Sequence, residues 1–122
     1  MSYLTRNIAA TLSWYLQRVT AILISIGLAV HFWVLHYAIE RPVTFEKVQE
    51  RLMSPGWLLF DLLLLSAVVY HGLNGLFNVL TDYNPSPMRK KIYGWGLTLI
   101  GLALVVYGYV IIMPFTQAGG VH

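Results

Sequence analysis

Three long apolar stretches dominate the pattern of hydrophobic and polar positions along this chain. No Lys, Arg, Asp or Glu occurs between Val19 and Leu35, between Leu62 and Leu80, or between Tyr93 and Met113. With its flanks, each stretch reaches the roughly 20 residues that a helix needs to cross about 30 Å of hydrocarbon. We therefore predict an all-α integral membrane protein with three transmembrane helices, at about residues 13–38, 56–80 and 92–114.

The segments outside these spans are short and carry weaker patterns. Apolar residues at every fourth position of residues 1–12 predict an amphipathic stretch on the membrane surface ahead of the first span. Apolar residues at helical spacing predict a brief interfacial helix within the connection 39–55, and a polar turn with two prolines occupies residues 81–91. Because no linker is long enough to separate domains, residues 1–122 are expected to form a single transmembrane domain.

The composition agrees with a membrane location. Of the 122 residues, 57% are hydrophobic and 11% are charged, against roughly 25% charged residues in an ordinary soluble domain. Cysteine is absent, which excludes disulfides, iron–sulfur ligation and thiolate chemistry within this chain. A redox centre held here would need other ligands, and histidine is the plausible one for haem.

The distribution of Lys and Arg predicts an orientation in the membrane. One side of the predicted bundle holds Arg6, Arg18, Arg89, Lys90 and Lys91, and the other holds Arg41, Lys47 and Arg51 beside three glutamates. The five-to-three bias places the N-terminus and the 81–91 turn in the cytoplasm and the C-terminus on the outer side. The predicted location is the inner, cytoplasmic membrane of a bacterium.

The second predicted helix has a polar face. Gly75, Asn78 and Asp82 follow His71 by four, seven and eleven positions, which places them within about 40° of it on a helix. Polar groups inside a span normally face a partner within the protein. A neutral imidazole is a good axial ligand for haem iron, and Gly75 would leave room for the porphyrin. Alternatively, His71 hydrogen-bonds a neighbouring helix and Gly75 permits close packing.

Residues of the second predicted helix, together with a motif that opens the first span, resemble those of a known family. His71, Gly75, Asp82 and Tyr83, together with Gln17-Arg18-Val19-Thr20-Ala21 opening the first span, resemble the smaller, D-type cytochrome b anchor of succinate dehydrogenase, respiratory complex II. The resemblance covers nearly the whole chain. It implies half of a two-subunit haem-binding anchor bundle whose partners are a C-type cytochrome b anchor subunit, an iron–sulfur subunit, a flavoprotein subunit and membrane lipid, without nucleic acid.

The resemblance also implies roles for individual residues. The family histidine that matches His71 ligates haem b, and the pair that matches Asp82 and Tyr83 lies at the quinone site, where the tyrosine hydroxyl hydrogen-bonds a quinone carbonyl. Arg18 is either an interfacial arginine or a contact to a haem propionate or a quinone oxygen. Ser13 is a further candidate for quinone binding, although its spacing from Arg18 differs from that of a similar Ser and Arg in the family's C subunit.

The first predicted helix contains a second candidate ligand. His31 lies about 18 residues, roughly 27 Å, from the cytoplasmic end, whereas His71 lies about nine residues, roughly 13 Å, from the same face. These depths differ too much for one iron. His31 is therefore either the ligand of a second haem, as in two-haem members of the family, or a packing residue; His36 is a poorer candidate. The sequence leaves open whether the quinone is ubiquinone or menaquinone.

Two other functions remain as alternatives from the sequence. The chain could be a small transporter or channel subunit in which His71, Asn78 and Asp82 line a polar path. It could also be a self-contained haem b protein that pairs with copies of itself. In either case the chain lacks a phosphate-cradling glycine loop for a flavin, so succinate oxidation itself is expected on another subunit.

The third predicted helix carries a regular glycine pattern. Gly94, Gly101 and Gly108 recur every seven positions and form a small-residue ridge. Such a ridge lets another helix approach closely. We therefore predict a packing role for this helix.

Overall fold

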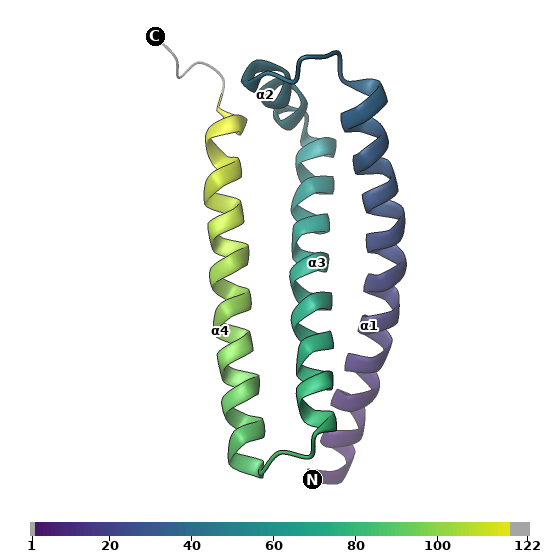
Figure 1. Cartoon of the computed structure of the whole chain (residues 1–122), viewed down its shortest axis with the longest axis vertical. Coiled ribbons are helices and arrows are strands. Elements are labelled where there is room, and N and C mark those ends of the chain that lie inside the picture. Colours follow the sequence, from purple (N-terminus) through teal and green to yellow (C-terminus); the bar gives the residue numbers. More distant parts are fainter. Residues whose placement is uncertain (1, 118–122) are drawn as a thin grey trace.

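The structure, a computed structural model, describes residues 2–117 as a set of helices. Three long helices lie side by side, namely α1 (Ser2–Trp33), α3 (Pro55–Asp82) and α4 (Pro87–Ile112), with α3 between the other two (Figure 1). The shorter elements are the π-helix η1 (Val34–Ala38), α2 (Phe45–Met53) and the 3-10 helix η2 (Met113–Thr116). Three helical segments are long and apolar enough to cross a membrane, which confirms the predicted fold class.

Helix α1 begins earlier than the sequence pattern predicted. The N-terminal stretch is not a separate element, because α1 runs without a break from Ser2 to Trp33. Neither proline nor glycine occurs in this helix before Gly27, so nothing interrupts its backbone hydrogen bonds. Its far end agrees with the prediction, since the π-helix η1 ends at Ala38.

The turn between α3 and α4 is also shorter than predicted. Helix α4 begins at Pro87 rather than near residue 92, because the Ser86 hydroxyl caps it by accepting a hydrogen bond from the backbone N–H of Arg89 at 3.4 Å. Asn84 makes the reversal with a left-handed φ of 51°, a conformation that asparagine tolerates. The basic residues of the predicted turn therefore lie in the first turns of α4.

The brief helix predicted within the connection 39–55 is confirmed as α2, which packs against α3 and η2 at the end of the molecule remote from the N-terminus (Figure 1). Thr44 caps it, and hydrogen bonds from the backbone N–H of Glu46 and then from the Thr44 hydroxyl hold the pKa of Glu46 below its ordinary value. Arg51 of α2 pairs with Asp61 of α3 at 2.7 Å. This largely buried ion pair connects α2 to the second span, and sequence reasoning did not find it.

Glycines allow α3 to approach both of its neighbours. A Cβ atom added at Gly27 of α1 would lie 2.7 Å from Leu64, and one added at Gly101 of α4 would lie 2.8 Å from Leu73. Gly108 is packed just as closely against Leu65. The predicted packing role of the glycine ridge on the third span is thus confirmed, and its partner is α3 of the same chain.

The three spans form an open layer rather than a closed bundle. Among the described residues the buried hydrophobic side chains are Val34 and Leu52, and the membrane-spanning window of α3 contains no buried residue although α3 is the central helix. The apolar side chains of the layer therefore face outward, where lipid or other subunits can cover them.

Candidate functional site

A row of hydrogen-bonded polar side chains crosses the contact between α1 and α3. We call this set the polar seam; it consists of Ser13, Gln17 and Thr20 of α1 and His71 and Asn74 of α3. The Ser13 hydroxyl donates to Asn74 Oδ1 at 3.0 Å, and Asn74 Nδ2 donates to Gln17 Oε1 at 2.7 Å. Gln17 Nε2 donates to the His71 backbone carbonyl at 3.2 Å. The amide and hydroxyl groups thus satisfy one another inside the layer, as polar groups in a span must.

The imidazole of His71 ends the seam on the side nearer the membrane centre. Its Nδ1 atom lies 3.1 Å from the hydroxyl oxygen of Thr20. Thr20 is 8% exposed, the lowest exposure among the polar residues described. Helix α1 therefore holds the ring of His71 at a buried hydroxyl.

The space beside Gly75 is occupied differently from what the sequence suggested. A Cβ atom at Gly75 would lie 3.2 Å from Gln17 Nε2, so this glycine makes room for the glutamine amide of α1. The close-packing alternative accounts for Gly75 within this chain. The glycine thus supports the seam rather than an open space next to His71.

The second ring nitrogen of His71 is available. His71 is half-buried, and its Nε2 atom makes no hydrogen bond to the described part of the chain. An imidazole that is held through one nitrogen and presents the other is the donor arrangement that a metal-ligating histidine requires. The residues present therefore fit an axial ligand to haem iron at His71.

His31 lies on the same face of α1 as the seam. In the antiparallel register set by Thr20 opposite His71 and Gly27 opposite Leu64, His31 is eleven residues from the level of His71, or about 16 Å along the helix. It is half-buried and makes no hydrogen bond within residues 4–117. The separation agrees with the predicted difference in depth.

The other histidine of this region is engaged locally. His36 lies in the π-helix η1, where its Nδ1 atom donates to the backbone carbonyl of Phe32 at 2.9 Å. Its ring also stacks on the Phe32 ring, with 3.9 Å between the ring centroids. These contacts give His36 a local packing role.

The predicted quinone residues lie at the end of α3 nearest the N-terminus of the chain. Asp82 is the last residue of α3 and Tyr83 is its C-cap; both are exposed, Tyr83 to 83%. They lie about 16 Å along the helix from His71. Both side chains are thus presented at one edge of the layer, and the chain itself does not enclose them.

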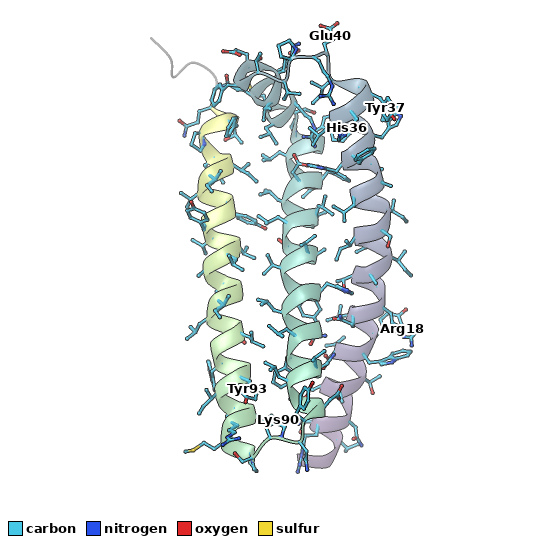
Figure 2. All side chains as sticks on the ribbon, in the orientation of Figure 1. Arg18, His36, Tyr37, Glu40, Lys90 and Tyr93 are labelled. Atoms are coloured by element: carbon cyan, nitrogen blue, oxygen red, sulfur yellow. The ribbon has the colours of Figure 1, made fainter. Side chains whose placement is uncertain are left out.

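Arg18 and Ser13 do not join Tyr83 in a single pocket of this chain. The Arg18 guanidinium lies over the ring of Trp14, 4.6 Å from its centroid, and projects from α1 on the side away from α3 (Figure 2). Ser13 uses its hydroxyl proton in the bond to Asn74. The contacts of Arg18 fit its interfacial interpretation, and those of Ser13 place it in the seam.

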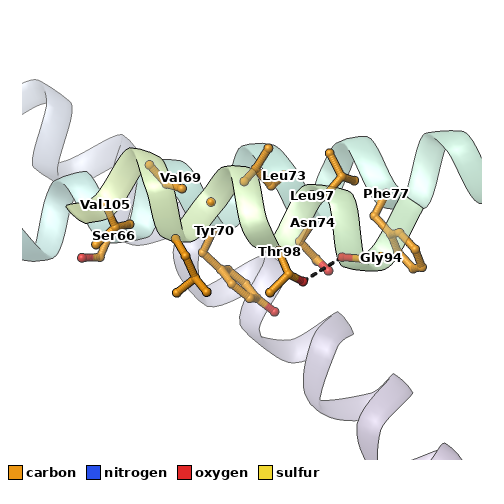
Figure 3. Close-up of a pocket in the computed structure, with 12 residues that line it drawn as sticks. Ser66, Val69, Tyr70, Leu73, Asn74, Phe77, Gly94, Leu97, Thr98 and Val105 are labelled. Atoms are coloured by element: carbon orange, nitrogen blue, oxygen red, sulfur yellow. Dashed lines mark hydrogen bonds between the residues drawn. The ribbon is translucent and has the colours of Figure 1, made fainter. Parts of the chain in front are cut away.

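A separate hollow lies between α3 and α4 (Figure 3). It has a volume of about 530 Å³ and a mostly apolar lining, with Tyr70 and Asn74 of α3 facing Thr98 of α4. His71 and Tyr83 are not among its lining residues. The hollow is therefore distinct from the haem-ligand candidate and from the quinone candidate.

Sequence reasoning missed three members of the seam. The sequence pattern did not indicate Asn74, because this residue lies about 60° from His71 around the helix, outside the face that carries Gly75, Asn78 and Asp82. Gln17 and Thr20 stood out in the sequence only as part of the motif at residues 17–21 that resembles the family. Gln17 and Thr20 follow Ser13 by four and seven positions, and this helical spacing is the signal that could have identified a polar stripe on α1.

Comparisons with known proteins agree on one family. Residues 3–113 match the succinate dehydrogenase/fumarate reductase transmembrane subunit family. A protein of Thermoplasma acidophilum named succinate dehydrogenase hydrophobic membrane anchor subunit is 32% identical over 102 residues, which cover 83% of each chain. A protein of the same name from Archaeoglobus fulgidus is 31% identical over 102 residues, which cover 84% of this chain and 86% of that one.

The seam predicts that Asn74 stabilises the α1–α3 contact. Replacing Asn74 by Leu removes the acceptor of Ser13 and the donor to Gln17, and we expect a destabilisation of roughly 1–2 kcal/mol. Thermal unfolding of the purified membrane complex measures this as a lower midpoint. Asn78→Leu is the matched control, because the exposed Asn78 side chain makes no hydrogen bond to the described residues. Equal midpoints for the two variants would contradict the seam.

Proposed function

This chain belongs to the succinate dehydrogenase/fumarate reductase transmembrane subunit family, and from that membership we propose that it is the D-type cytochrome b anchor of succinate:quinone oxidoreductase. It is a multi-pass membrane protein. In the proposed role it holds the catalytic subunits on the membrane, contributes an axial ligand to haem b and forms part of the site of quinone reduction. Succinate oxidation takes place on a flavin in another subunit.

One observation carries the haem assignment. His71 lies in a transmembrane helix, is held through Nδ1 by a buried hydroxyl, and has Nε2 free of hydrogen bonds to the described residues. Bound haem b would supply a one-electron centre within the membrane. The α1–α3 pair would hold the imidazole of His71 toward the haem, and a partner anchor subunit would supply the remaining protein ligand.

The quinone assignment rests on the end of α3. Tyr83 presents a phenol that can donate a hydrogen bond to a quinone carbonyl, and Asp82 presents a carboxylate that can accept and pass on a proton. Quinone reduction consumes two protons, so a titratable group beside the hydrogen-bond donor suits the reaction. In the orientation predicted from the distribution of Lys and Arg, this edge is cytoplasmic, and it would face the iron–sulfur subunit.

The remaining walls of the quinone pocket would come from the C-type anchor and the iron–sulfur subunit, because this chain does not enclose Tyr83. Arg18 would contact a haem propionate or a quinone oxygen only on the side of α1 that faces away from α3, where its guanidinium lies over Trp14. Ser13 would contribute through its hydroxyl oxygen while its proton stays with Asn74. The quinone is ubiquinone or menaquinone, and the proposed location is a bacterial inner membrane.

The position of His31 supports a second haem as part of this proposal. Its separation of about 16 Å along the bundle from His71 suits two haems at different depths rather than one. His31 also lies one turn from Gly27 on the α3-facing side of α1, and it has no competing hydrogen bond within the described residues. We include His31 in the proposal as the ligand of the distal haem.

The transporter alternative is disfavoured by the seam and by the family. The polar residues between α1 and α3 bond to one another instead of lining a water-filled path. Both relatives are named as membrane anchor subunits of succinate dehydrogenase. The anchor function accounts for the same intramembrane polar groups.

The haem proposal predicts that His71→Ala removes the haem b at His71. Without the imidazole the haem at this site loses a ligand, so its contribution to the haem b band is expected to be lost from the reduced-minus-oxidised spectrum of the purified complex, while the contribution of the haem at His31 remains. His36→Ala is the control, because His36 bonds within its own helix. Retention of the full band in the His71 variant would rule out this ligand.

The second-haem proposal predicts a change in haem count. We expect His31→Leu to lower the number of haems per complex from two to one, because leucine offers no ligand atom at that depth. Quantitative haem extraction against protein concentration gives the count. A count that does not change would assign His31 to packing.

The quinone proposal predicts a selective effect of Tyr83→Phe. Loss of one hydrogen bond to quinone is worth about 1 kcal/mol, so we expect a several-fold to roughly tenfold lower kcat/KM for quinone. Succinate oxidation coupled to a soluble dye should be unchanged. Tyr93→Phe, near the same edge on α4 (Figure 2), is the control. Identical quinone kinetics in the two variants would remove Tyr83 from the site.

A further inference from the structure

We propose that Thr20 is a positioning residue for His71. Its hydroxyl accepts a hydrogen bond from Nδ1 and thereby fixes the imidazole tautomer whose Nε2 lone pair is free for iron, and this bond lowers the reduction potential of the haem bound there. The inference rests on the proposed ligation of haem by His71.

The direction of the hydrogen bond follows from the neighbours of the hydroxyl. Thr20 Oγ1 lies 2.6 Å from the backbone carbonyl oxygen of Leu16 and 3.2 Å from that of Gln17. A carbonyl can only accept, and a hydroxyl has a single hydrogen to donate. That hydrogen points to the backbone of α1, so the hydroxyl oxygen acts as the acceptor toward His71 Nδ1 at 3.1 Å. Nδ1 therefore carries the proton and Nε2 carries the lone pair.

The surroundings hold this arrangement in place. Thr20 is buried at 8% exposure, and a β-branched side chain bonded to the carbonyl four residues earlier has little rotamer freedom in a helix. Gln17, one turn from Thr20 on α1, donates a hydrogen bond to the backbone carbonyl of His71. Helix α1 thus fixes both the ring and the backbone of the ligand residue.

The electronic consequence has a definite sign. An imidazole that donates through its second nitrogen becomes a more basic ligand and favours the oxidised iron. A hydroxyl that already donates to a carbonyl is a better acceptor, and the dry interior strengthens the bond further. Removing the acceptor is therefore expected to raise the reduction potential.

The experiment compares three variants of the intact, purified complex. Thr20→Val keeps the shape and removes the hydroxyl, whereas Thr20→Ser keeps the hydroxyl. Thr98→Val is the matched control, because Thr98 makes the same bond to the carbonyl four residues earlier, at 2.7 Å to Gly94, without touching a histidine (Figure 3). Potentiometric titration of haem b and the electron paramagnetic resonance g-values of the oxidised haem are the readouts.

We expect Thr20→Val to shift the potential of one haem to more positive values, change its g-values, and weaken haem retention by roughly 10- to 100-fold. Thr20→Ser and Thr98→Val should resemble the wild type. A wild-type potential in Thr20→Val, or an equal shift in Thr20→Ser, would overturn the role of Thr20 and leave ligation by His71 intact. Full haem retention in His71→Ala would instead overturn the ligation on which the inference depends.

A measurement on the unaltered complex covers the case in which Thr20→Val does not assemble. With ¹⁵N-labelled histidine, solid-state NMR distinguishes protonated from unprotonated ring nitrogens, and the His71→Ala variant identifies the signal. We expect a protonated Nδ1 at His71. An unprotonated Nδ1 would show that Thr20 is not its acceptor and would overturn the proposal.

Discussion

The need to pair polar groups where water is absent governs this molecule. Ser13, Gln17 and Asn74 would each be costly in the hydrocarbon region if they stood alone, and together they form one hydrogen-bonded row between two helices. That row sets the register of α1 against α3 in a way that interchangeable leucines cannot. Once the register is set, Thr20 lies opposite His71, and the position of the imidazole follows from the packing of the two helices.

The same constraint explains the shape of the layer. Helix α3 contacts α1 through the polar seam and through Leu64 packed over Gly27, and it contacts α4 mainly through apolar side chains packed over glycines. Outside these contacts its surface remains exposed. The chain is therefore organised as a component of a larger anchor, in agreement with the family to which it belongs.

The spans could be predicted from the sequence because apolar length is a property of one segment at a time. The start of α1 could not, because an amphipathic surface helix and an extension of the span have the same residue pattern when no proline or glycine separates them. The polar face of α3 was also only half predicted. The angles around one helix placed Asn78 beside His71, whereas the contact with α1 brings in Asn74. The side of a helix that meets its neighbour depends on how the two helices pack together. The role of Gly75, which makes room for the Gln17 amide of α1, depends on the same packing.

We propose that Nε2 of His71 binds haem iron while Nδ1 stays bonded to Thr20. An experimental structure of the intact complex with its haem tests this most directly. We expect density for the iron at coordinate-bond distance from His71 Nε2, with the Thr20 hydroxyl still within hydrogen-bond distance of Nδ1. Iron whose two axial ligands both come from other residues, or a His71 ring turned to bind through Nδ1, would contradict it.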